Sequence, residues 1–226
     1  METCSTLCLA APSICWGKSD AQYRAHSGTC RKGRVMLYII RHGQTELNSK
    51  HALQGRSDHP LNDTGKEQAR ETAKSLENLG IRFDHVYTSP LIRAIQTAEI
   101  IAPGIEPLID ERLIEMDYGP YEGTDLNNLP PEVLEFFRDF SHNPAPKGME
   151  QLSSVVERLG RFLEEIRDVS GNILLSTHAI AMKGALEYLT PESRGAYWSK
   201  YIGNCAIYAA ESKDDRFGIP YELRIG

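Results

Sequence analysis

The sequence contains no long hydrophobic run and no excess of positive charge. The apolar stretch at residues 7–14 is interrupted by Pro12 and is too short to span a membrane. The formal net charge of the 226 residues is −6, so the protein as a whole lacks the basic field that attracts nucleic acids or anionic membranes. We therefore expect no nucleic-acid and no membrane partner, and any anionic ligand must be bound by a few local groups.

Cysteine is scarce outside the amino terminus. Four of the five cysteines lie within the first 30 residues, and the rest of the chain contains only Cys205. This distribution argues against a core held together by disulfides. A secretory signal would require basic residues before its apolar stretch, and none precedes the apolar stretch at residues 7–14. We therefore predict a cytoplasmic protein.

Residues 1–34 differ in composition from the rest of the chain. They contain five basic and two acidic residues, and they show neither helical nor strand periodicity. We expect a disordered amino-terminal extension at residues 1–34, followed by a single domain at residues 35–226. Met36 stands at the head of the first predicted strand. A second interpretation is therefore that translation begins at Met36 and that the extension is not part of the native protein.

From residue 35 on, strand patterns alternate with helix patterns. An unbroken apolar run at residues 35–40 predicts a fully buried strand, and residues 152–166 place their apolar side chains at helical spacing. The alternation predicts an α/β fold of three layers, with helices on both faces of a mostly parallel central sheet. The predicted strands are residues 35–40, 85–88, 172–177, 204–209 and 220–225, and the predicted helices are residues 63–79, 91–101, 131–140, 152–166 and 179–189.

One long stretch, at about residues 110–149, fits neither pattern well. It is rich in glycine, proline and acidic residues. Long insertions of this kind usually cover a functional site. We therefore expect residues 110–149 to form a lid.

Two histidines directly follow predicted buried strands. His42 lies between Arg41 and Gly43 after the strand predicted at residues 35–40, and His178 follows Thr177 at the end of the strand predicted at residues 172–177. Ligands of open α/β sheets bind beyond the carboxyl ends of the strands, so both imidazoles are expected in one crevice. A neutral imidazole is a good nucleophile toward phosphorus, and a guanidinium binds phosphoryl oxygens. Taken alone, each histidine is better explained as a hydrogen-bonded loop residue, and it is the pair at matching strand ends that favours a functional role.

Metal chemistry is the poorer explanation of these histidines. A zinc site would need a third ligand and a spacing such as His-Glu-x-x-His, and the sequence shows neither. We predict no metal.

Further motifs accompany the two histidines along the chain. The sequence contains, in chain order, Arg-His-Gly-x-Thr-x-x-Asn at 41–48, Leu-Gln-Gly-Arg-x-Asp-x-Pro-Leu at 53–61, Gly-x-x-Gln-Ala at 65–69, Thr-Ser-Pro-Leu-x-Arg-Ala-x-x-Thr-Ala at 88–98, Glu-x-x-Tyr-Gly-x-x-Glu-Gly at 115–123 and Ser-Thr-His at 176–178. These motifs resemble those of the histidine phosphatase superfamily, in the branch of cofactor-dependent phosphoglycerate mutases and related small phosphatases. The resemblance implies a phosphoglycerate mutase-like fold.

The resemblance also implies a role for each matching residue. His42 is expected to become phosphorylated, and Glu115 to act first as general acid on the leaving oxygen and then as base on water. Two arginines and a second imidazole would supply the positive charge, so neither a metal nor a cofactor is expected. The residues expected to bind the substrate phosphate are Arg41, Asn48, Gln54, Gly55, Arg93 and His178, of which Arg41, Arg93 and His178 also count as catalytic.

Some positions are expected to be structural, and one departs from the family pattern. Asp63 or Thr64 is expected to cap a helix, Gly65 to serve its start and packing, and Glu150 to be a favourable first-turn carboxylate. The family usually has glycine after the second histidine, whereas this chain has Ala179. A methyl group there would narrow the approach of the backbone to phosphate.

The same chemistry can end in hydrolysis or in mutase activity. Mutases of this family carry a basic insertion with an adjacent arginine pair that holds the substrate carboxylate. Residues 115–139 instead contain seven acidic residues and a single basic one, Arg138. Such a lid would not hold a second anionic group or retain a bisphosphate primer, which favours water as the acceptor.

We therefore predict a phosphomonoester hydrolase for a small phosphorylated metabolite. Phosphoglycerate mutase is the alternative, and a non-catalytic module that binds phosphorylated ligands is a further one. The sequence carries no signal for the natural substrate or for the oligomeric state.

Overall fold

A computed structural model describes residues 35–140, 142–213 and 216–224. The described residues belong to one compact unit. The predicted disordered extension at residues 1–34 lies outside the described residues.

The central sheet is built around the apolar run that opens the described chain. This run forms β1. The strands of the sheet lie side by side in the order β3-β2-β4-β1-β5-β6, and β7 also pairs with β5. The strands β3, β2, β4 and β1 are parallel, whereas β5 pairs antiparallel with β1, β6 and β7. The bounds are β1 Met36–Arg41, β2 His85–Thr88, β3 Leu108–Ile109, β4 Asn172–Thr177, β5 Ile207–Lys213, β6 Arg216–Phe217 and β7 Tyr221–Leu223.

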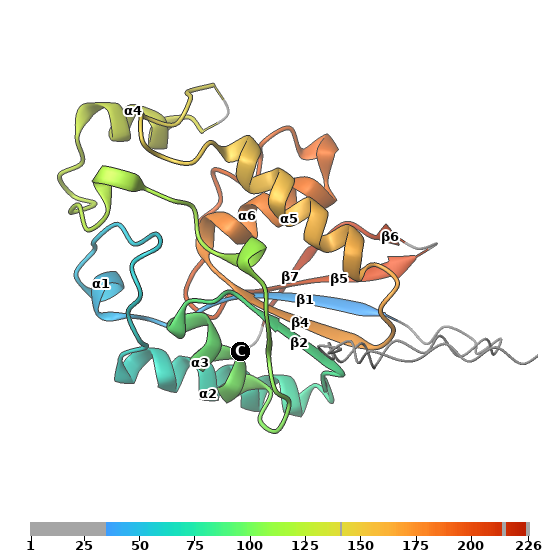
Figure 1. Ribbon diagram of the computed structural model, residues 1–226. Coiled ribbons are helices and arrows are strands. Elements are labelled where there is room, and N and C mark those ends of the chain that lie inside the picture. Colours follow the sequence, from blue (N-terminus) through green and yellow to red (C-terminus); the bar gives the residue numbers. More distant parts are fainter. Residues whose placement is uncertain (1–34, 141, 214–215, 225–226) are drawn as a thin grey trace, which may run out of the picture. The chain divides into compact units, whose positions relative to one another are not determined.

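Helices cover both faces of this sheet, as the alternating pattern predicts (Figure 1). Alternate side chains of β1 point to opposite faces: Tyr38 and Ile40 belong to one apolar cluster, and Leu37 and Ile39 to the other. The first cluster includes residues of α2 (Asp63–Asn78) and α3 (Ile92–Ile101), and the second those of α5 (Leu152–Ile166) and α6 (Ala179–Leu189). The predicted three-layer α/β fold is confirmed.

The sequence misplaces some element boundaries. The strand predicted at 204–209 begins at Ile207, because Asn204 and Cys205 turn the chain toward β1 with Cys205 at φ 56°. The strands β3 and β6 were not predicted, because each has only two residues and is too short for a detectable hydrophobic pattern.

The amino-terminal cap of α2 is Asn62, rather than Asp63 or Thr64. The Asn62 side chain accepts a hydrogen bond from Gly65 N at 2.8 Å. Gly65 packs so closely on the turn after β1 that a Cβ there would lie 2.0 Å from the carbonyl oxygen of Gln44. The predicted packing role of Gly65 therefore has a clear steric reason. Gly80 ends the helix region at φ 70°, a conformation that favours glycine.

The predicted lid contains little regular secondary structure. Residues 110–149 contain two 3-10 turns, η1 (Glu111–Leu113) and η2 (Gly119–Tyr121), and the short helix α4 (Pro131–Arg138). In Figure 1 the part of this stretch that contains η2 and α4 lies at the same end of the molecule as α1 (Glu46–Ser49), the first helix after β1. Since β1 ends there, the lid region borders the end of the sheet where both histidines emerge.

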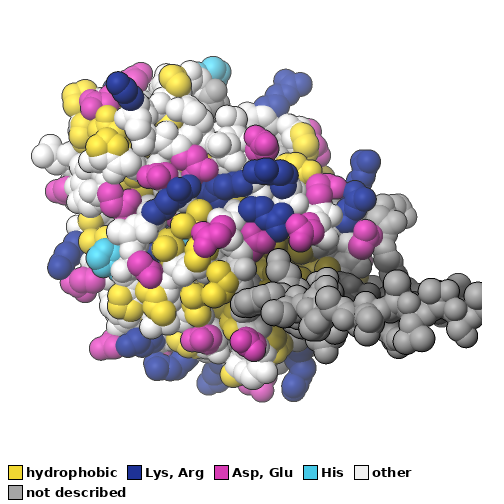
Figure 2. All heavy atoms as spheres, in the orientation of Figure 1, with side chains coloured by type: hydrophobic (Ala, Val, Ile, Leu, Met, Phe, Trp, Pro, Cys, Tyr) yellow, Lys and Arg dark blue, Asp and Glu magenta, His cyan; other side chains and the backbone are white. Residues whose placement is uncertain are grey.

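The lengths of the helices and the charges on the surface bear on membrane and polyanion binding. No helix among the described residues is long and apolar enough to cross a membrane. Acidic and basic side chains are interspersed over the face drawn in Figure 2. This face therefore shows no broad basic area of the kind that binds polyanions.

Candidate active site

The parallel pairing of β1 and β4 brings the two histidines together. Arg41 lies opposite Thr177 in the register, and His42 N donates to the carbonyl oxygen of Thr177 at 2.9 Å. The centroids of the His42 and His178 rings are 5.1 Å apart. Both side chains are buried, with exposed fractions of 3% and 0%.

The hydrogen bonds of His42 define its reactive atom. Its Nδ1 lies 2.7 Å from the carbonyl oxygen of Gly43, which can only accept, so Nδ1 carries the proton. The lone pair is therefore on Nε2, which faces Arg93 Nε at 3.3 Å. Burial, followed by the charges of Arg93 and Arg41, holds the pKa of His42 well below its usual range. The ring is thus a neutral imidazole with a nucleophilic Nε2.

His178 is oriented from both sides. Its Nδ1 accepts from Arg93 Nε at 3.2 Å, so Nε2 carries the proton and donates to Ser89 Oγ at 2.7 Å. Burial, followed by the charge of Arg93, lowers the pKa of His178 well below its usual range. Ser89 was not predicted as a site residue, although it stands inside the Thr-Ser-Pro motif.

Arg93 lies between the two histidines and is completely buried. Its Nη1 donates to the carbonyl oxygen of Ser57 at 2.8 Å and its Nη2 to that of Gly55 at 2.6 Å. Burial lowers the pKa of Arg93 to about 10, so the side chain is charged at neutral pH. Because each Nη carries two hydrogens, one on each remains for an anionic ligand.

Two further buried donors of this site have no hydrogen-bond partner among the described residues. Arg41 Nη1 donates to the carbonyl oxygen of Ile202 at 2.6 Å, but Arg41 Nε has none. Gln54 Oε1 accepts from Thr45 Oγ1 at 2.7 Å and from Asn48 Nδ2 at 3.2 Å, which leaves Gln54 Nε2 without one. Buried donors in proteins are nearly always satisfied, so these two atoms are ready for an acceptor from a ligand.

Gly55 makes hydrogen bonds within the protein and has no free N–H group for the substrate phosphate. Its N–H donates to Glu122 Oε1 at 2.8 Å, and its carbonyl oxygen receives Arg93. The backbone is packed so tightly that a Cβ on Gly55 would lie 2.7 Å from the Tyr118 ring and from Glu122 Oε2. In this arrangement Gly55 supports Arg93, and its N–H is already engaged.

Glu115 lies at the amino terminus of α6. Its Oε1 accepts from Met116 N and Ala181 N, both at 2.9 Å, and its Oε2 accepts from Ile180 N at 3.2 Å. The N–H groups that follow Ala179 therefore bind this carboxylate. The side chain is 4% exposed, and its charge raises the pKa of both Arg41 and Arg93 against the effect of burial.

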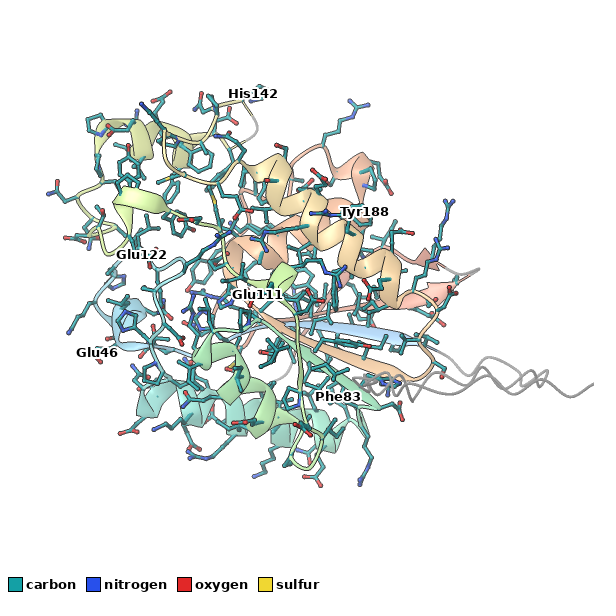
Figure 3. All side chains as sticks on the ribbon, in the orientation of Figure 1. Glu46, Phe83, Glu111, Glu122, His142 and Tyr188 are labelled. Atoms are coloured by element: carbon teal, nitrogen blue, oxygen red, sulfur yellow. The ribbon has the colours of Figure 1, made fainter. Side chains whose placement is uncertain are left out.

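A carboxylate from the lid region secures the loop that holds Arg93. Glu122 Oε1 accepts from Gly55 N at 2.8 Å, from Ser57 N at 3.3 Å and from Ser57 Oγ. The carbonyl groups of the same two residues hold Arg93. Figure 3 labels Glu122, which lies at the same end of the molecule as α1. Glu122 stands in one of the sequence motifs, but its contacts with Gly55 and Ser57 span 67 and 65 residues, so the sequence does not predict this network.

Glu150 is not the first-turn carboxylate that was expected. α5 begins two residues later with Gln151 as its cap, and Glu150 Oε1 pairs with Arg158 Nε at 2.9 Å. Glu150 Oε2 also lies 3.3 Å from Arg56 Nη2. Arg158 Nη1 donates to the carbonyl oxygens of Arg112 and Ile114, both at 2.6 Å. This cluster fastens the chain directly before Glu115.

The described residues hold no group of three or more His, Cys, Asp or Glu side chains arranged as metal ligands. Positive charge in the site comes from Arg41 and Arg93. The arrangement places a neutral nucleophile, unpaired buried donors and one carboxylate around the same strand ends, which suits transfer of a phosphoryl group.

Comparisons with known sequences agree with this geometry. The profile of the histidine phosphatase superfamily (branch 1) matches residues 37–221. The chain is 33% identical over 181 residues to a protein of Escherichia coli O1:K1 named probable phosphoglycerate mutase GpmB, a match that covers 76% of this chain and 83% of that protein.

Two crystal structures of a phosphoserine phosphatase from Entamoeba histolytica are similar to this fold. A mutant in complex with phosphoserine gives a TM-score of 0.71 at 26% identity and covers 84% of this chain and 95% of that one. The complex with 3-phosphoglyceric acid gives a TM-score of 0.71 at 25% identity and covers 85% and 96%.

Proposed function

Because the chain belongs to the histidine phosphatase superfamily, we propose that it hydrolyses a small phosphomonoester through a phosphohistidine at His42. One observation carries the proposal. The lone pair of His42 Nε2 points at Arg93, whose remaining N–H groups are placed for phosphoryl oxygens. A nucleophile and the charge that stabilises its transition state are thus held together before substrate arrives.

In the first step, His42 Nε2 attacks phosphorus and the ester P–O bond breaks. Arg93, Arg41 Nε and Gln54 Nε2 donate to the phosphoryl oxygens, and Glu115 in its acid form gives the leaving oxygen a proton. The product is an alcohol, a phosphorylated His42 and a Glu115 carboxylate.

In the second step, water attacks the phosphorus of phosphohistidine. The Glu115 carboxylate takes a proton from this water, the N–P bond breaks, and inorganic phosphate leaves. His42 returns to its neutral form and Glu115 to its acid form. The N–H groups of Met116, Ile180 and Ala181 donate to Glu115 and hold its carboxylate in place for this step.

The lid supports hydrolysis over mutase activity. The single basic side chain of residues 115–139, Arg138, is 67% exposed and lies 3.5 Å from Glu135. Phe136, Phe137 and Phe140 pack against one another in and after α4. An aromatic lid without an arginine pair has no means of retaining a bisphosphate, so the phosphoryl group passes to water. The E. coli relative named a probable mutase keeps mutase activity as the alternative.

The experiment is a screen of phosphate release from a panel of metabolites, with a chromogenic aryl phosphate included and mutase activity assayed in parallel. We expect hydrolysis that disappears in His42→Ala and persists in EDTA, because the arginines already neutralise the phosphoryl charge. Mutase turnover exceeding phosphate release would favour the alternative. No turnover of any ester would favour a binding module. Activity lost in EDTA and restored by a divalent ion would contradict metal independence.

A further inference from the structure

An asparagine outside the sequence motifs contacts the backbone of the nucleophile. Asn204 lies three residues before β5. Its Nδ2 donates to the carbonyl oxygen of His42 at 3.0 Å and to Asn48 Oδ1 at 3.3 Å. These contacts span 162 and 156 residues of the chain, so no local motif reveals them. Asn204 thus joins the loop before β5 to the loop that carries His42.

Backbone groups fix the direction in which the amide of Asn48 faces. The carbonyl oxygen of His42 can only accept, so Asn204 turns its NH2 group toward it, and the same NH2 group reaches Asn48 Oδ1. The backbone N–H of Thr45 can only donate, and it donates to Asn48 Oδ1 at 3.2 Å. With both donors on its oxygen, Asn48 presents its Nδ2 on the other side.

The direction of Asn48 in turn sets that of Gln54. Asn48 Nδ2 donates to Gln54 Oε1 at 3.2 Å, and Thr45 Oγ1 donates to the same oxygen at 2.7 Å. A hydroxyl group can rotate to donate or to accept, so Thr45 alone does not decide which atom of Gln54 faces it. Asn48 does, because a reversed Gln54 would place two NH2 groups against each other with no acceptor between them. Gln54 Nε2 is therefore the atom left for a ligand.

Asn204, Asn48 and Gln54 form an amide relay that ends beside the phosphoryl site. Gln54 is buried and directly precedes Gly55, whose carbonyl oxygen receives Arg93 Nη2 at 2.6 Å. Arg93 Nε lies 3.3 Å from His42 Nε2. Gln54 is thus linked to the nucleophile in two ways, through the loop that holds Arg93 and through the amide relay.

We propose that Asn204 is a positioning residue, which acts through Asn48 to keep the N–H donor of Gln54, and not its carbonyl oxygen, toward the phosphoryl group. This inference rests on the proposed function. A donor stabilises the charge of the phosphoryl oxygens, whereas an amide oxygen in the same place repels it. Asn204 therefore controls how tightly the phosphoryl group is bound, although it acts only through two other side chains.

Substitutions of Asn204 should weaken phosphoryl binding. Inorganic phosphate, used as a competitive inhibitor, measures this binding without the chemical step, and an aryl phosphate measures kcat/KM. We expect Asn204→Ala to raise the inhibition constant of phosphate and to lower kcat/KM by about 3- to 10-fold, the usual effect of losing one uncharged hydrogen bond. Asn204→Asp has the same shape but turns acceptors toward both neighbours, so it should cost about 10- to 100-fold.

A double-mutant cycle separates positioning from structural support. Gln54→Ala removes the end of the amide relay, so adding Asn204→Ala to it should change the inhibition constant of phosphate by less than about twofold. If Asn204 only supports the backbone of His42, its substitution should cost as much without Gln54 as with it. Equal losses in the two backgrounds would therefore overturn the inference.

Another asparagine provides the matched control. Asn172 Nδ2 also donates to a backbone carbonyl oxygen, that of Arg82 at 2.7 Å, but it does so at the start of β4, the end remote from the site. Asn172→Ala should leave phosphate inhibition and kcat/KM unchanged. Losses equal to those of Asn204→Ala would mean that any such anchor affects the site, and would also overturn the inference.

The wild-type protein supplies a test that does not depend on the folding of a variant. In protein labelled with ¹⁵N-glutamine, the side-chain N–H signals of Gln54 should shift when inorganic phosphate binds, because Nε2 then gains an acceptor. Signals that stay in place while phosphate inhibits turnover would overturn the inference. Gln54 signals that shift with phosphate in a protein that hydrolyses no ester would contradict the proposed function and not the positioning of Gln54.

Discussion

Removing the carboxylate of Glu122 should disable Arg93, although Glu122 acts on it only through the loop between them. Glu122 Oε1 accepts three hydrogen bonds from Gly55 and Ser57, and the carbonyl oxygens of these two residues hold the Arg93 guanidinium. Glu122→Ala removes all three acceptor contacts. Glu122→Gln keeps an oxygen at the Oε1 position and loses only the charge.

The size of the effect follows from these contacts. A hydrogen bond to a charged group contributes roughly 1.5–3 kcal/mol, and a half-buried carboxylate such as Glu122 belongs near the lower end of that range. A displacement of about 1 Å in a positioning group costs on the order of 10²-fold in rate. We expect Glu122→Ala to lower the rate of His42 phosphorylation by about 10- to 100-fold. Glu122→Gln should lose less than about tenfold, because its oxygen still orders the loop.

The assay is single-turnover phosphorylation of His42 with an aryl and an alkyl phosphate. A loosened Arg93 stabilises the phosphoryl oxygens less well whichever group leaves, so Glu122→Ala should slow both esters by similar factors. Because Glu122 acts through Arg93, adding Glu122→Ala to Arg93→Ala should cost little more. Additive losses, or a loss confined to the alkyl ester, would refute the reasoning. The second result would make Glu122 itself a proton donor.

Three further perturbations have defined outcomes. Glu115→Gln should slow phosphoenzyme formation at least about tenfold more for an alkyl than for an aryl ester, because an aryl oxygen departs unprotonated; equal losses in single-turnover assays would assign the proton elsewhere. Gly55→Ala should abolish most turnover, since its Cβ would meet three groups at 2.7 Å, whereas Gly203→Ala, whose Cβ would meet only one atom at 3.7 Å, should match wild type. The lowered pKa values of His42 and His178 mean that below pH 6.5 the unfolded chain binds protons that the folded protein does not. In urea unfolding, the free energy of unfolding should therefore fall by about 1 kcal/mol per pH unit for each histidine as the pH is lowered from 6.5 to 5.5. His178→Asn should make this dependence on pH less steep. An unchanged slope would mean that His178 is protonated in the folded protein.

Local sequence patterns predict most of the framework. The run at residues 35–40 is apolar on both faces, which identifies a central strand, and β1 extends over residues 36–41. The histidines directly follow β1 and β4, so the parallel register alone brings them together. The antiparallel pairing of β5 with β1 was not predictable in this way, because a local hydrophobic pattern identifies a strand but not the direction in which it pairs.

The supporting contacts of the site are long-range and lie beyond a local pattern. Arg93 is held by backbone carbonyl groups, which every residue possesses, so no motif identifies Ser57 as its partner. Gln54 and Gly55 are adjacent in one motif, yet the first leaves a donor unpaired and the second has its N–H bound to Glu122.

The central claim is that phosphate passes through His42. Incubation with a ³²P-labelled phosphomonoester, followed by an alkaline quench and peptide mapping, tests it directly. The account predicts an acid-labile label on His42 that is absent from His42→Ala, because Nε2 is the unprotonated nucleophile beside Arg93. Label on a serine or aspartate, or turnover that survives His42→Ala, would contradict it.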